Sequence, residues 1–238
     1  MRKSDLQLAA GQERNQRQMM TKQTEKIRRL VFTAVLMAII LLMCVTPIGY
    51  LRAGPVSITF LVIPVALGAI LFGPVVGLIL GTFFGATSFM QCFGLLSFYG
   101  VDAFGAACFS INPVGTIVMC FVPRMLFGLL TAYLYRLFRR LFARFDRQNI
   151  LSFAVSFVVG TVLHTVMFVS AFVIFFRNAD LSVALGDQYV LSTKTIVEVI
   201  GIFFTTNAVI EAVACGVLGT AVAKALSVFL NKRNLEGR

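Results

Sequence analysis

The chain has 238 residues, of which 58% are hydrophobic and only 13% are charged, and its mean hydropathy is +0.89. A soluble protein cannot bury so large an apolar fraction, so the composition favours one membrane domain and excludes a second catalytic domain of ordinary size. The formal net charge of +11 is compatible with nucleic-acid binding, but no aromatic-basic pattern or soluble module accompanies it, so we expect no nucleic-acid partner.

The basic residues form three blocks that predict the topology. The first block precedes the first apolar run, the second occupies residues 136–147, and the third closes the chain from residue 224. Lysine and arginine are enriched in cytoplasmic loops, so all three blocks are expected to face the cytoplasm. Both chain termini are then cytoplasmic, which requires an even number of membrane spans.

Apolar length and helix-breaking residues predict an all-α membrane protein with a bundle of six transmembrane helices. The predicted spans are about Ile27–Thr46, Ile58–Gly73, Pro74–Cys92, Pro113–Phe138, Ile150–Phe176 and Thr195–Phe229. Residues 1–26 are predicted to be a basic cytoplasmic arm, residues 27–230 the transmembrane domain, and residues 231–238 a cytoplasmic tail.

The stretch Ile58–Gly85 is almost entirely apolar and is divided in two by Gly73-Pro74. Proline donates no backbone hydrogen bond and glycine readily ends a helix, so two spans are expected here. Glycine also recurs at four-residue steps, at Gly73, Gly77, Gly81 and Gly85. Glycines at this spacing share one helical face, which predicts unusually close packing against a neighbouring helix.

The outer connections are expected at Pro47–Ser57, Phe93–Asn112 and Arg177–Lys194. The first contains two glycines, two prolines, a tyrosine and an arginine, a composition that suits a hinged loop closing over a ligand or a simple helix connection. The second is rich in aromatic residues and is expected to cover the outer mouth of the bundle. Cys92 and Cys108 flank this loop and could pair, although cysteines within spans are usually reduced thiols.

Motifs for common chemistries are missing from the sequence. It contains no G-x-x-x-x-G-K-[ST] phosphate loop, no H-E-x-x-H zinc motif and no G-x-S-x-G nucleophile turn, and its only histidine is His164. We therefore expect no enzymatic activity, no ATP hydrolysis by this chain, no metal site and no cofactor.

Polar residues inside the predicted spans are the candidate functional groups, because burying them in a bilayer is costly. They are Arg124, His164, Glu198, Asn207 and Glu211. Counted at about 1.5 Å per residue, Arg124, His164 and Asn207 lie at similar depths, whereas Glu198 lies near the outer surface. Two interpretations remain open: Arg124 and Glu211 form a structural ion pair, or Arg124, His164 and Asn207 line a cavity that binds a polar molecule, to which arginine could hold a carboxylate.

Three segments resemble the substrate-binding S component of energy-coupling factor (ECF) transporters, particularly the folate-type group. They are RAGPVSITFLVIPVALGAILFGPVVGLILGTFFG at Arg52–Gly85, NPVGTIVMCFVPRMLFGLL at Asn112–Leu130, and the A-x-x-x-A pattern from Ala34 to Ala38. The resemblance covers about residues 27–230.

The resemblance implies a six-helix vitamin-binding subunit that works with a transmembrane coupling protein and two cytoplasmic ATPases. It further implies that Ala34 and Ala38 dock on the coupling protein. Substrate would bind near the outer surface, in the region of Arg52, Tyr99, Asn112, His164, Glu198 and Asn207. Arg52 and Arg124 favour a substrate that carries a carboxylate.

The leading hypothesis is therefore an uptake subunit for a vitamin-like solute in a bacterial inner membrane. A self-sufficient carrier is the first alternative, with Glu211 or Glu198 as its proton site, although no internal repeat is visible. A membrane scaffold or assembly factor is the second alternative, for which the glycine face would suffice.

Overall fold

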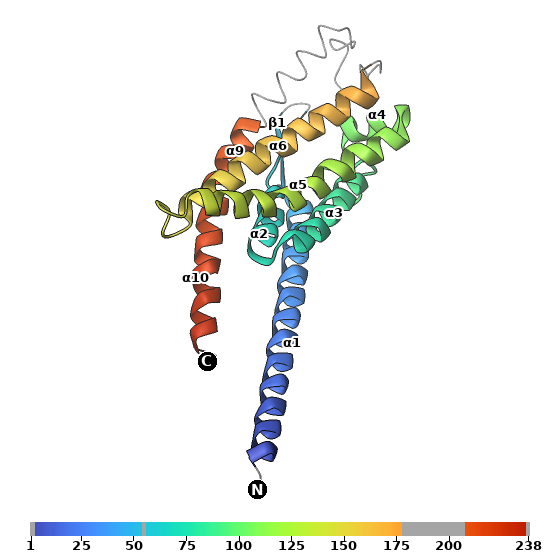
Figure 1. Cartoon of the computed structure of the whole chain (residues 1–238). Helices are drawn as coiled ribbons and strands as arrows, with labels where there is room; N and C mark the ends of the chain where they lie inside the picture. The colour runs from blue at the N-terminus through green and yellow to red at the C-terminus, as the bar shows by residue number, and fades with distance from the viewer. Residues whose placement is uncertain (1–2, 54–55, 178–207, 237–238) are drawn as a thin grey trace. The chain divides into compact units, whose positions relative to one another are not determined.

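The computed structural model describes residues 3–53, 56–177 and 208–236, which are mainly helical (Figure 1). The elements are α1 (Lys3–Cys44), β1 (Tyr50–Ala53), β2 (Val56–Thr59), α2 (Val62–Phe72), α3 (Pro74–Gln91), α4 (Ala103–Ile111), α5 (Pro113–Leu141), α6 (Ile150–Phe176), α9 (Val209–Ala214), the π-helical η2 (Cys215–Gly219) and α10 (Thr220–Glu236). The chain divides into two compact units, and the boundary between them lies between Val35 and Leu36. The second unit contains every element except the first part of α1.

Five stretches of the described residues are long and apolar enough to cross a bilayer, namely Lys22–Cys44, Pro74–Gln91, Pro113–Leu141, Ile150–Phe176 and Val209–Phe229. Six spans are therefore not confirmed. The predicted second span, Ile58–Gly73, is reduced to the 11 residues of α2, which extend about 16 Å against a hydrocarbon core of about 30 Å. The first part of the predicted sixth span lies outside the described residues.

The first two residues of this predicted span, Ile58 and Thr59, end strand β2 instead, and the rest of the β-hairpin occupies the predicted connection Pro47–Ser57. Strands β1 and β2 pair in antiparallel fashion, with Tyr50 opposite Thr59 and Ala53 opposite Val56. Residues 56–59 read Val-Ser-Ile-Thr, a period-two alternation rich in β-branched residues that is typical of a strand. A long apolar run follows these four residues directly. A prediction based on apolar length therefore assigned the end of the strand and the following helix to one span.

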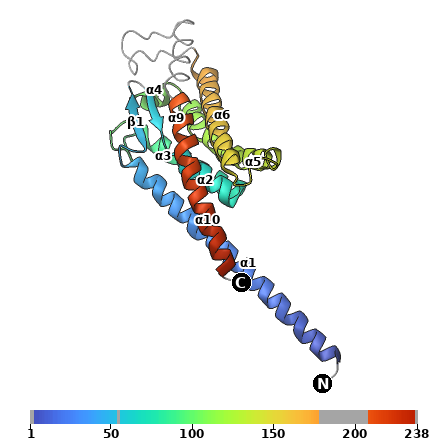
Figure 2. The ribbon, with the colours of Figure 1, turned by 90° about the vertical axis from the view of Figure 1, so that its left-hand side faces the viewer.

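The β1–β2 hairpin is attached to the helical bundle on both sides and lies next to α9 (Figure 2). The hydroxyl groups of Tyr50 and Ser88 on α3 are hydrogen-bonded at 3.0 Å. On the open edge of β2, the Thr59 amide donates to a carboxyl oxygen of Glu211 on α9 at 2.6 Å. The next amide, of Phe60, bonds to the Gly49 carbonyl in the opposite direction, as alternation in an antiparallel pair requires.

The predicted close packing of the glycine face is confirmed, and its partner is α5. A Cβ added to Gly77 would overlap the carbonyl oxygen of Gly128, and one added to Gly128 would overlap that of Gly77. One turn further along α3, Gly81 lies against the backbone of Arg124 on α5. One turn beyond that, Gly85 lies against the backbone of Cys120 and Phe121. Helices α3 and α5 therefore touch backbone to backbone, which side chains would prevent.

Two ends of the bundle can be distinguished by these contacts. At the arginine end, Gly73 has a φ of 98° between α2 and α3, and a Cβ there would lie 3.6 Å from an Arg136 nitrogen near the end of α5. At the hairpin end, Tyr50 contacts Ser88 in the last turns of α3. The α2–α3 turn therefore lies beside the second basic block, as the predicted topology requires.

The aromatic connection Phe93–Asn112 contains a packed helix, α4. Its N-cap, Asp102, accepts a hydrogen bond from the Gly105 amide at 3.1 Å. Phe104 and Cys108 of α4 are buried against α5 and α6. All five cysteines are buried free thiols, so Cys92 and Cys108 do not pair.

Candidate functional site

The central polar residue of the site is Arg124, and a proline explains how α5 holds it. Pro123 has no amide hydrogen, so the Met119 carbonyl, four residues earlier, loses its normal helical donor. The Arg124 guanidinium replaces that donor, with Nη1 2.5 Å from the Met119 oxygen. The sequence Pro-Arg thus places a guanidinium inside the bundle and gives it one backbone partner.

His164 on α6 supplies the second polar group. Its side chain is buried, with 6% of its surface exposed. Neither Nδ1 nor Nε2 has a hydrogen-bond partner among the described residues, and the same is true of the buried Nε of Arg124. Buried polar nitrogens are normally satisfied, so three of them in one place need a partner from outside this set of residues.

Aromatic rings join these two residues. The Arg124 guanidinium lies 5.5 Å from the Phe84 ring centre and 4.9 Å from that of Phe168. The His164 ring lies 6.1 Å from Phe84 and 5.3 Å from Phe127. Phe84 therefore touches both polar groups, and helices α3, α5 and α6 each contribute to one cluster.

The cluster combines a fixed positive charge, an imidazole and aromatic faces in an apolar bundle. A guanidinium can hold a carboxylate with two hydrogen bonds, and an imidazole can donate from one nitrogen and accept at the other. The cluster therefore suits a polar molecule with an anionic group and a flat ring. The phenylalanines were not predicted, because in a chain with 24 of them no local pattern distinguishes a site residue from a packing residue.

Three other predicted site residues lie away from the middle of the bundle. Asn112 is the N-cap of α5, where its side-chain oxygen accepts from the Gly115 amide at 2.9 Å. It precedes Arg124 by twelve residues, about 18 Å along the helix axis. Tyr99 is exposed in the α3–α4 connection and its ring meets that of Phe98 edge-on. Arg52 belongs to strand β1, so its backbone is held in the hairpin.

The remaining polar candidates have different outcomes. Glu198 and Asn207 lie outside the described residues. Glu211 is buried on α9, but its hydrogen bond goes to the Thr59 amide, and Arg124 bonds to Met119. Each side chain therefore satisfies a backbone group, and neither hydrogen bond supports the structural ion pair between Arg124 and Glu211. Strand β2, whose outer edge provides the Thr59 amide, was not predicted, so this role for Glu211 could not be foreseen.

Ala34 and Ala38 lie four residues apart on α1, and both are exposed. Leu36, Ile40 and Cys44 of the same helix are buried. Within the second unit, Ala38 thus lies on an open face of α1, with exposed apolar neighbours such as Leu42.

Comparison with known proteins identifies one related family. A family model described as "ECF transporter, substrate-specific component" matches residues 28–223, which is well over half of the chain and includes the Arg124–His164 cluster. No match was found among curated proteins.

Proposed function

This chain belongs to the family of ECF transporter substrate-specific components, and from that premise we propose that it captures a vitamin-like small molecule from outside a bacterial inner membrane. Family and composition make it a multi-pass membrane protein and a substrate-binding subunit of a transporter. The observation that supports a ligand site is the cluster of Arg124 and His164 around Phe84, with three buried nitrogens that lack partners among the described residues.

The proposed ligand carries a carboxylate and a flat ring or amide. Arg124 would bind the carboxylate, since two of its nitrogens can donate in parallel to two oxygens. His164 would contact a polar edge of the ligand, and Phe84, Phe127 and Phe168 would contact its apolar surface. Folate, pantothenate and biotin all carry a carboxylate, and the folate-type group is the subgroup that the sequence resembles. Arg52, Tyr99, Asn112 and Glu198 remain candidate contacts nearer the outer surface, and Asn207 remains a candidate contact at the depth of Arg124 and His164.

Binding by the purified protein tests this proposal without any transport partner. We expect one of folate, pantothenate, biotin, riboflavin, thiamine and pyridoxine to raise the thermal unfolding midpoint in detergent. A ligand at one hundred times its Kd should stabilise the folded state by about 2.7 kcal/mol, and the shift should grow with the logarithm of concentration. Absence of a shift with all six compounds would contradict the proposal.

The proposed partners are a transmembrane coupling protein and two cytoplasmic ATPases. The exposed Ala34 and Ala38 support this, because small residues leave a shallow surface on which another helix can pack closely. A coupling partner is also consistent with a chain that carries no phosphate loop of its own.

Affinity purification from the native membrane tests the partners. The wild-type chain should co-purify with a coupling protein and ATPases, and Ala38→Leu should remove them while leaving ligand binding unchanged. Ala221→Leu, the same substitution at an exposed position on α10, is the matched control and should keep the complex. Loss of the complex in both variants, or in neither, would refute a docking role for Ala38.

A further inference from the structure

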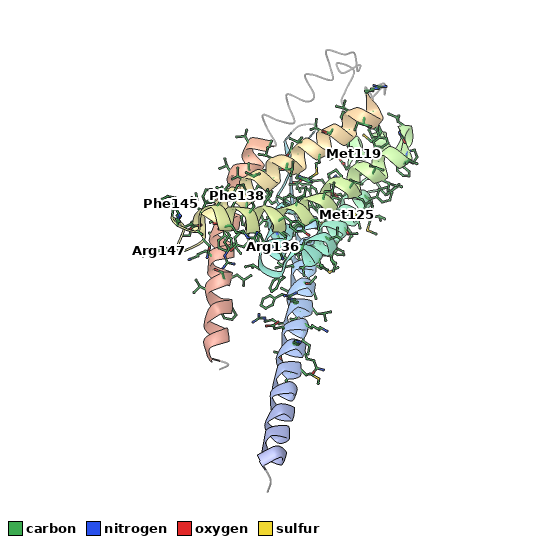
Figure 3. The ribbon with its side chains drawn as sticks, viewed as in Figure 1. Met119, Met125, Arg136, Phe138, Phe145 and Arg147 are labelled. Carbon is green, nitrogen blue, oxygen red and sulfur yellow. The ribbon has the colours of Figure 1, made fainter. Side chains whose placement is uncertain are left out.

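A dense group of cations occupies the arginine end of the bundle, away from the Arg124–His164 cluster. Residues 136–147 contain five arginines and one acidic residue. The arginines are Arg136, Arg139, Arg140, Arg144 and Arg147, and all five are exposed. Figure 3 shows Arg136 and Arg147 toward the end of α5 opposite to Met119. Lys224 of α10 joins this end through a hydrogen bond from its amine to the Gln148 carbonyl at 2.8 Å.

The single acidic residue of this segment is already engaged. Asp146 accepts hydrogen bonds from the amide of Ser152 at 2.7 Å and from its hydroxyl at 2.8 Å. Desolvation acts to raise the pKa of Asp146, but these hydrogen bonds outweigh it and hold the pKa below its ordinary value. The carboxylate therefore stabilises the first turn of α6, and no described carboxylate forms a salt bridge with Arg139, Arg140, Arg144 or Arg147.

Apolar side chains are exposed among these arginines. Phe145 is 85% exposed, Leu141 66% and Leu137 58%, and Figure 3 shows Phe145 at the same end of α5. Helix α5 has 29 residues and is about 43 Å long, longer than a hydrocarbon core of about 30 Å. With its N-terminus at one face of the core, its last turns lie among the lipid headgroups of the other face.

We propose that the arginine end binds the phosphate groups of anionic phospholipids. Arg139, Arg140, Arg144 and Arg147 would contact the phosphates, while Leu141 and Phe145 insert between the acyl chains below them. Exposed cations mixed with exposed apolar residues are the composition of a segment that lies in an anionic membrane surface. The proposal goes beyond the prediction that these arginines face the cytoplasm, because it requires the protein to prefer anionic lipids over neutral lipids of the same leaflet. It does not depend on the ligand or the partners of the transporter.

Native mass spectrometry of the full chain, purified in detergent, tests the lipid preference. The protein is mixed with phosphatidylglycerol or phosphatidylcholine of identical acyl chains, and bound lipids are counted. Each arginine near an anionic surface contributes about a fivefold preference, so Arg139/Arg140/Arg144→Gln should lower the preference for phosphatidylglycerol by on the order of a hundredfold. The charge-conserving Arg139/Arg140/Arg144→Lys should keep most of it. Arg177→Gln, at the exposed end of α6 far along the helix from Asp146, should leave it unchanged.

Several outcomes would overturn the proposal. They are equal binding of both lipids by the wild-type protein, an unchanged preference in the glutamine variant, and an equal loss in Arg177→Gln. Displacement of phosphatidylglycerol by millimolar inorganic phosphate would show a phosphate site rather than a lipid site. Added salt should weaken the preference, since exposed charges are screened. If the triple variant does not fold, Arg140→Gln alone should reduce the preference about fivefold.

Discussion

Replacing Gly128 by leucine should lower the free energy of unfolding by about 3 kcal/mol or more, the upper range for an overpacked interior. The reason is the backbone contact between α3 and α5. Even one added carbon at Gly128 overlaps the carbonyl oxygen of Gly77, and a backbone atom inside a helix cannot rotate away as a side chain can. Gly128→Ala should show the same effect at a smaller size, and Gly77→Leu should match Gly128→Leu.

Thermal unfolding and size-exclusion elution in detergent measure this effect. Val122→Leu also adds volume to α5, but at a position that is 42% exposed, and should shift the midpoint little. An unfolding midpoint for Gly128→Leu equal to that of Val122→Leu would mean that α3 and α5 do not meet through their glycines.

Replacing Arg124 by methionine should abolish most ligand binding and also destabilise the fold, and a second substitution can separate these effects. The stability loss, about 1–3 kcal/mol, comes from the Met119 carbonyl that loses its donor. Pro123→Ala supplies a backbone amide for that carbonyl. Pro123→Ala/Arg124→Met should therefore recover the unfolding midpoint that Arg124→Met loses.

Ligand affinity should not recover in the double variant, because no guanidinium remains to hold a carboxylate. With the ligand found by thermal shift, we expect its Kd to stay at least about thirtyfold weaker than in the wild type. Pro123→Ala alone should bind normally and serves as the control. Recovery of affinity together with stability would show that Arg124 is only a backbone donor.

The long helices could be predicted from the sequence because apolar length and helix-breaking residues act over many positions. Ile150–Phe176 has the predicted bounds, and the break at Gly73-Pro74 is confirmed by the end of α2 and the start of α3. The glycine spacing likewise predicted a close helix contact, although a periodic face does not identify its partner. That partner is α5, whose own contact residue, Gly128, is a single glycine without a repeat.

The candidate site was only partly predictable. Arg124 and His164 are conspicuous because charge and imidazole are rare inside apolar spans. The bond from Arg124 to Met119 was readable in principle, since Pro123 must leave a carbonyl without its helical donor. The contact between Thr59 and Glu211 could not be predicted in this way, because it joins residues 152 positions apart. It also depends on a strand whose sequence signal is only four residues long.

The two hydrogen bonds that hold the β1–β2 hairpin affect how readily a solute could enter or leave at this end of the bundle. A net contribution of about 1 kcal/mol from each bond means that a hairpin free of both is populated about one time in thirty, before any apolar contact is counted. One bond goes to α3 and the other to α9, so moving either helix alone breaks only one of them. If the hairpin covers a bound solute, the residence time of that solute therefore depends on helices α3 and α9 in addition to the solute's own contacts.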